Sequence, residues 1–120
     1  MRKHVITIVG ILMMAMTQAA FADAQLLAAL PAANSVVVSP QALMLNFSEQ
    51  IRPDASLITV KGPDKQIIKT EPFAISGTNP TEVLLPFGQI LHSGIYQVDW
   101  QVLSVKGHKK TSGMFQFTVK

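Results

Sequence analysis

Apolar and polar positions alternate along three stretches of this chain, residues 43–47, 95–102 and 114–119. Successive side chains of a β-strand point to opposite faces, so the alternation predicts strands with one buried face and one polar face. In the longest stretch the apolar face carries Tyr96 and Trp100. Aromatic residues at strand period usually pack inside, and we expect both rings in the core.

Shorter runs of β-forming residues lie between these stretches, with turn residues separating them. The runs are residues 25–27, 36–38, 57–60, 66–69 and 82–85. Residues 62–64, Gly-Pro-Asp, predict a tight turn that joins the third and fourth runs in a hairpin. Beyond the N-terminal region a helical period is seen only in residues 26–33, and Pro31 interrupts it. About seven short strands predict an all-β fold, a small immunoglobulin-like antiparallel β-sandwich or Greek-key barrel.

Residues 1–22 have the pattern of a secretory signal peptide. A basic start is followed by an uncharged apolar run at residues 5–16, and then by Ala-Phe-Ala before the expected cut. A membrane anchor is the alternative, but crossing a bilayer takes about 20 apolar residues and this run is shorter. We therefore predict cleavage after Ala22, export to the periplasm, and a single domain over residues 23–120.

Charge and cysteine content narrow the classes of function. Ten Lys and Arg face seven Asp and Glu in the whole chain, and only eight basic residues remain once Arg2 and Lys3 leave with the signal. A nearly neutral domain without a large basic cluster is not expected to bind nucleic acid. The chain has no cysteine. Disulfides, thiolate catalysis and cysteine-type zinc sites are therefore excluded.

Catalytic patterns are also missing from the sequence. Ser104, His108 and Asp99 supply the residue types of a serine hydrolase, but no nucleophile-elbow motif surrounds the serine. A glycine-rich phosphate loop and zinc-ligand spacing are absent. We therefore do not expect an enzyme.

Six segments of the chain, taken in order, resemble the motifs of CopC-type periplasmic copper-binding proteins. They are residues 28–34 (family motif S-x-P-A-x-G), 43–49 (L-x-L-x-F-S-E), 60–64 (V-x-G-P-D), 94–100 (G-x-Y-x-V-D-W), 104–109 (S-x-D-G-H) and 113–119 (G-x-x-x-F-x-V). The match covers essentially the whole predicted mature chain. The resemblance implies the same immunoglobulin-like β-fold that the periodicity predicts.

The resemblance also implies periplasmic copper binding and handover, linked to copper tolerance, uptake and homeostasis. An inner-membrane copper transporter of the CopD type is the partner it suggests. The family's Cu(II) site uses the mature N-terminal histidine together with the aspartate and histidine of the D-G-H loop. The glutamate of F-S-E lies nearby in some members. An optional methionine-rich Cu(I) loop has no counterpart, because residues 62–80 contain no methionine.

The family site is altered when it is carried onto this sequence residue by residue. Asp23, not histidine, is the predicted first mature residue, and Gln25 removes an alternative site that would use a third-position histidine. Lys106 stands where the family has the loop aspartate. His108 and Glu49 are kept. The candidate metal ligands are therefore His108, Glu49 and Asp23, the last also through its amine.

This donor set favours Cu(II) over Cu(I), since imidazole and amine nitrogens with oxygen support are what Cu(II) prefers. A lysine ammonium at position 106 would repel the dication. The first hypothesis is a copper-binding protein with a weakened or altered site. The alternative is an immunoglobulin-like interaction module that binds no metal and acts with a membrane partner. A copper monooxygenase is disfavoured because Asp23 lacks the N-terminal imidazole which that chemistry needs.

Overall fold

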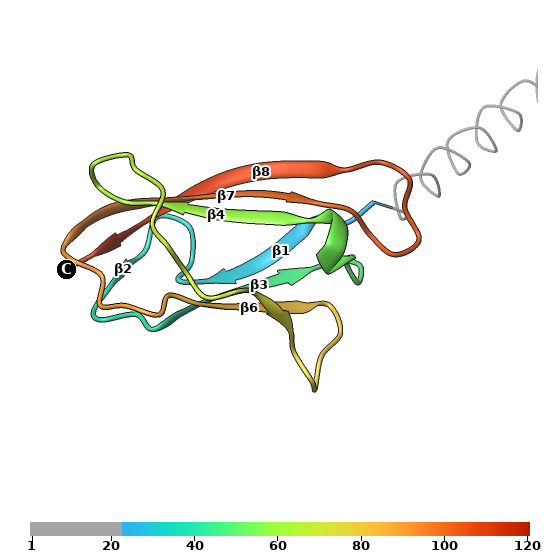
Figure 1. Ribbon diagram of the computed structural model, residues 1–120, viewed down its shortest axis with the longest axis horizontal. Coiled ribbons are helices and arrows are strands. Elements are labelled where there is room, and N and C mark those ends of the chain that lie inside the picture. The colour runs from blue at the N-terminus through green and yellow to red at the C-terminus, as the bar shows by residue number, and fades with distance from the viewer. Residues whose placement is uncertain (1–22) are drawn as a thin grey trace, which may run out of the picture.

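Two four-stranded β-sheets, packed face to face, make up residues 23–120, the part of the chain that the computed structural model describes (Figure 1). The predicted signal peptide, residues 1–22, lies outside the described residues. Within residues 23–120, no helix is long and apolar enough to span a bilayer.

The first sheet has the strand order β1-β3-β6-β5 and is antiparallel throughout. Its strands are β1 (Leu26–Leu30), β3 (Ala42–Phe47), β6 (Glu82–Pro86) and β5 (Ala74–Ile75). Every second residue of β3 is buried, as the alternation in residues 43–47 predicts. The outer face of this sheet remains largely apolar, since Leu30 pairs with Met44 and Met44 with Leu84.

The second sheet has the order β2-β8-β7-β4. Its strands are β2 (Val36–Val37), β8 (Thr111–Val119), β7 (Gly94–Val102) and β4 (Leu57–Lys61). The two long strands coincide with the two longest alternating stretches of the sequence. β2 runs parallel to β8, whereas the other pairs are antiparallel. The sandwich expected from the sequence is confirmed, with this one parallel pair as a correction.

Aromatic rings pack together in the core, both within the second sheet and between the two sheets. Tyr96 stacks on Phe117 with ring centroids 5.5 Å apart, and Phe87 lies 6.3 Å from the same ring. Trp100 is partly buried, and its ring meets Phe47 edge-on at 5.4 Å. The expectation that Tyr96 is a core residue is confirmed, while Trp100 lies at the margin of the core.

Two short elements differ from the sequence expectation. Residues 66–69 do not form the return strand of a hairpin: only an isolated bridge joins Ile67 to Lys61. The chain leaves this turn and pairs β5 with the other sheet instead. A 3-10 turn, η2 (Pro53–Ala55), precedes β4. None of these short segments has enough residues to show a period.

Candidate metal site

Three segments that are distant in sequence meet at one end of the sandwich. The N-terminal segment joins the end of β3 through two bonds: the Ser48 amide donates to the Gln25 carbonyl at 2.8 Å, and the Gln25 amide donates to Ser48 Oγ at 2.8 Å. The Thr111 hydroxyl donates to the Ala24 carbonyl at 2.6 Å. The start of β8 is therefore held against the same N-terminal segment.

The loop between β7 and β8, residues 103–110, is fixed at its base by the segment after β3. The Val105 amide donates to the Gln50 carbonyl and the Arg52 amide to the Leu103 carbonyl, each at 2.8 Å. Ser104 is buried and bridges to Ile51. The rest of the loop then projects outward from a rigid base.

The candidate ligands lie on these three segments but are not equally placed. His108 is exposed on the β7–β8 loop, while Asp23 and Glu49 are half-buried. Over residues 23–120, no group of three or more His, Cys, Asp or Glu side chains is arranged to hold a metal ion. The structure therefore brings the ligand-bearing segments together without assembling their side chains into a ready metal centre.

The Asp23 amine is a donor that only processing would create. In the uncut chain Asp23 carries a peptide N–H, which is neither a base nor a metal ligand of the same kind. Cleavage after Ala22 would free an amine next to Ala24, and Thr111 ties Ala24 to the β7–β8 loop region. A site using this amine belongs to the processed protein.

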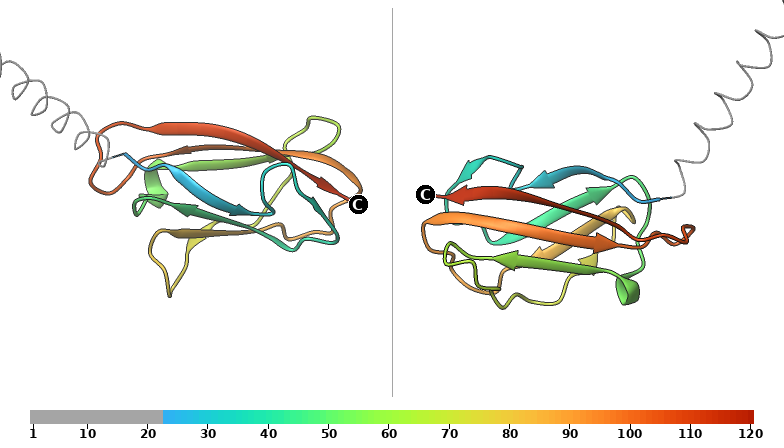
Figure 2. Two further views of the ribbon diagram at one scale, coloured as in Figure 1. Left: turned by 180° about the vertical axis from the view of Figure 1, so that it is seen from behind. Right: turned by 90° about the horizontal axis from the view of Figure 1, so that it is seen from above.

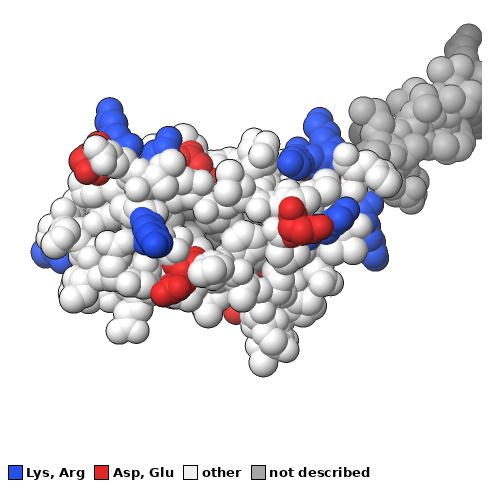
Figure 3. Space-filling model, in the orientation of Figure 1, with Lys and Arg blue, Asp and Glu red and all other residues white. Residues whose placement is uncertain are grey.

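Lys106 places a positive charge where the resemblance implies a carboxylate. It is exposed and lies two positions from His108 on the same loop. Lys109 and Lys110 follow, also exposed, and residues 103–110 contain no acidic side chain. Lys and Arg side chains appear at this end of the molecule in Figure 3, with acidic atoms beside one of them. The loop thus repels a dication and attracts anions.

Two further polar residues, Asp99 and His92, take part in structural contacts. Asp99 lies on the outer face of β7, where Lys61 Nζ approaches its carboxylate at 3.5 Å. His92 is exposed, and its backbone carbonyl accepts a 2.7 Å hydrogen bond from the Tyr96 hydroxyl. Burial raises the pKa of Tyr96 above its ordinary value, the bond to His92 works in the opposite direction, and the Asp64 charge adds to the rise.

Sequence reasoning missed the residues that hold this end together. Ser48 and Thr111 make the long-range bonds to the N-terminal segment. Ser48 falls within the F-S-E segment, so its place in that motif was the available signal. Thr111 carries no comparable signal, because its bond spans 87 positions in sequence.

Comparison with known proteins gives consistent matches over this whole domain. The family model for the CopC domain matches residues 26–120. Protein YobA of Escherichia coli K12 is 40% identical over 105 residues, which cover 87% of this chain and 84% of that protein. Copper resistance protein C of Escherichia coli is 30% identical over 127 residues, covering 100% of this chain and 98% of that protein.

Solved structures agree with these sequence matches. PcoC from Escherichia coli, described as a methionine-rich copper resistance protein, superposes with a TM-score of 0.71 at 26% identity, covering 81% of this chain and 98% of PcoC. CopC from Methylosinus trichosporium OB3b superposes with a TM-score of 0.72 at 30% identity, covering 81% of this chain and 93% of that CopC chain. Both β-folds correspond to the two-sheet arrangement described above.

Proposed function

Because the chain belongs to the CopC family, we propose that it is a periplasmic copper-binding protein whose Cu(II) site is weaker than an intact family site. Family membership confirms the expectation that the chain is not an enzyme, since CopC proteins carry copper and do not catalyse a reaction. The relatives named for copper resistance support a role in copper tolerance. Export by a cleaved signal peptide would deliver the domain to that compartment.

The observation that carries this proposal is the meeting of three segments at one end of the sandwich. Asp23, Glu49 and His108 lie on separate segments, and hydrogen bonds join those segments. We assign His108 as the main ligand, because it is the imidazole retained from the family loop. The Asp23 amine and the Glu49 carboxylate would complete a mixed nitrogen and oxygen set that suits Cu(II).

Lys106 explains why the proposed site is weak. Its ammonium group lies on the same short loop as His108 and opposes a divalent charge there. The loop also lacks the carboxylate that would offset the charge of the metal. We therefore expect the protein to hold its copper ion loosely and to hand it over to a partner. An inner-membrane transporter of the CopD type is the proposed acceptor.

A second candidate function follows from the absence of a gathered ligand set among residues 23–120. If the Asp23 amine and Glu49 do not approach His108, the domain binds no metal and acts as an immunoglobulin-like interaction module with a membrane partner. Measuring whether the processed protein binds a metal distinguishes the copper-binding function from the interaction module.

Histidine substitution tests the proposed site directly. His108→Ala should abolish Cu(II) binding measured by calorimetric titration of the processed protein. His92→Ala is the matched control, because His92 precedes β7 whereas His108 follows it, at opposite ends of that strand. Binding should also weaken in acid, since imidazole must be neutral to bind a metal. Tight binding that survives His108→Ala would show that the site lies elsewhere.

A further inference from the structure

β1 runs alongside β8 at the open side of the sandwich (Figure 2). A slot lies between these edges of the two sheets. Its volume is about 610 Å³. The walls are β1 on one side and Gly113, Met114 and Phe115 of β8 on the other, with Trp100, Ala32 and Ala33 completing the lining. No charged side chain lines it. We call this feature the β1–β8 slot.

Both walls of the slot are strand edges without a pairing strand. β1 is the last strand of its sheet. β2 covers β8 only at Thr118 and Val119, which leaves residues 111–115 unpaired on that side by any strand of the described chain. Exposed edges of this kind usually carry lysine or proline that prevents pairing. The sequence of β1, Leu-Leu-Ala-Ala-Leu, contains neither.

Hydrogen bonds hold the two ends of the slot at fixed positions. At one end the Thr111 hydroxyl donates to the Ala24 carbonyl at 2.6 Å. At the other end the Asn34 amide donates to the Gln116 carbonyl at 2.7 Å. The opening between them is therefore part of the folded structure and has a defined length along the strands.

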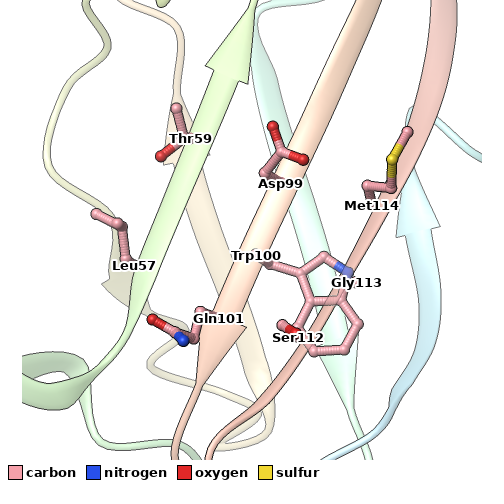
Figure 4. Close-up of a pocket in the computed structure, with 8 residues that line it drawn as sticks. All are labelled: Leu57, Thr59, Asp99, Trp100, Gln101, Ser112, Gly113 and Met114. Carbon is pink, nitrogen blue, oxygen red and sulfur yellow. The ribbon is translucent and has the colours of Figure 1, made fainter.

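Trp100 supplies the slot with an aromatic surface. Its ring crosses from β7 over β8 at Gly113 (Figure 4). A Cβ at Gly113 would lie 2.5 Å from Trp100 Cζ2, so only glycine leaves room for the ring there. Trp100 is the only tryptophan of the chain. Any molecule that enters the slot must change the surroundings of this ring.

The slot has one basic end. Thr111, which ties that end, directly follows Lys109 and Lys110, and Lys106 lies on the same loop. Asp23 precedes Ala24 at this end, so three lysines stand against one carboxylate there. The other end is bordered by Ala32, Ala33 and Asn34, which carry no charge. An extended chain lying in the slot would therefore have apolar residues along its length and acidic residues where it passes the lysines.

We propose that the β1–β8 slot binds an extended segment of a partner protein, apolar against Trp100 and acidic beside Lys106, Lys109 and Lys110. The segment would add a strand to the free edge of β8 or β1, so that main-chain hydrogen bonds give affinity. The lysines fix its direction. An anionic membrane fits less well, because the free edges of β1 and β8 offer main-chain hydrogen bonds that a peptide can use and a lipid surface cannot.

Peptide binding in the slot does not require copper, although the basic end of the slot lies on the same loop as His108. The lining of the slot includes none of the proposed copper ligands, and the slot uses the basic loop as an anion-binding element. The test therefore uses processed protein purified from the periplasm, in the presence of a chelator. If the protein proves not to bind copper, the peptide binding expected here is unchanged. If the slot proves not to bind the peptide, the copper binding expected above is unchanged.

The probe is a short synthetic peptide in which alternating valine and threonine are followed by three aspartates. Binding should shift the fluorescence of Trp100 to shorter wavelength and reduce its quenching by acrylamide, because the peptide shields the ring. The control peptide has lysine in place of each aspartate and should bind at least about tenfold more weakly at low salt.

Variants of the protein locate the contact. The double variant Lys109→Glu with Lys110→Glu should bind the acidic peptide at least about tenfold more weakly than the native protein does. Lys65→Glu with Lys69→Glu makes the same charge change away from the loop and should have a much smaller effect. Leu27→Asp, at an exposed position of the slot wall, should also abolish binding while circular dichroism shows an unchanged fold. The proposal is overturned by equal binding of both peptides, by an unchanged Trp100 signal, or by self-association of the protein as the only interaction detected.

Discussion

The residue scale is where this chain departs from its family. On the cleavage and motif alignment that we propose, Asp23, Gln25 and Lys106 replace metal ligands of the family site or alternatives to them, while His108 and Glu49 are retained. Lys106 joins Lys109 and Lys110 in a loop, residues 103–110, that has no acidic residue. We propose that these side chains make the loop less suited to a cation and more attractive to an anion.

Gly113 is the residue on which the position of Trp100 depends. We predict that Gly113→Ala lowers the free energy of unfolding by roughly 1–3 kcal/mol, because the new methyl group would overlap the indole ring. Gly77→Ala is the matched control, since a Cβ at Gly77 meets nothing within 4 Å. Urea unfolding of both variants measures the difference. Equal stability of the two would mean that the Trp100 ring does not cross β8.

At the scale of single elements, long alternating strands were predictable and short ones were not. β7 and β8 follow the alternation of their sequences. β2 and β5 have two residues each, which are too few to show a period. The strands with which they pair therefore depend on tertiary packing and not on their own sequence. Residues 66–69 illustrate the same limit: they have β-forming side chains after a tight turn, yet only one bridge forms there.

The candidate site was predictable to the level of segments but not of side-chain geometry. The resemblance to the CopC family implied that residues near 23, 49 and 108 belong to one site, and hydrogen bonds join those segments. Whether three donors can reach one metal depends on loop conformation and on an amine that exists only after cleavage. Neither is encoded in a local pattern of residues.

Tyr96 makes the packing of β7 measurable. Burial raises its pKa above the ordinary value of 10.0, so the folded state holds the phenolic proton more tightly than the unfolded chain does. The contribution of Tyr96 to stability should therefore be constant below pH about 10 and be lost as the pH rises from there toward the folded-state pKa. Ultraviolet absorbance of phenolate reports this group alone, because Tyr96 is the only tyrosine. A midpoint equal to that of the urea-unfolded chain would contradict its burial against Phe117.

At the scale of the whole molecule, the two sheets form a scaffold that presents two adjoining features. The β3 end, the N-terminal segment and the β7–β8 loop form the proposed copper end, and the β1–β8 slot runs from that end along the open side of the sandwich. Thr111 belongs to both, because its bond to Ala24 closes the slot and holds the N-terminal segment. A bound partner segment would therefore lie beside the proposed metal ligands.

Processing is a prediction at this scale, because the proposed site needs a free amine at Asp23. Mass spectrometry of protein from the periplasm should give a chain that starts at Asp23. Protein retained in the membrane with Met1 intact would contradict both the export prediction and the amine ligand.

The central claim is that this scaffold can hold Cu(II) and that Asp23 and Lys106 make the site weak. The most direct measurement compares Cu(II) affinity, by competition with a chelator of known affinity, for native protein and for the variant Asp23→His with Lys106→Asp. The repaired protein should bind orders of magnitude more tightly, because it regains an N-terminal imidazole and exchanges a repelling charge for a carboxylate. An unchanged affinity in the repaired protein, which retained its fold, would mean that the three segments do not form a copper site.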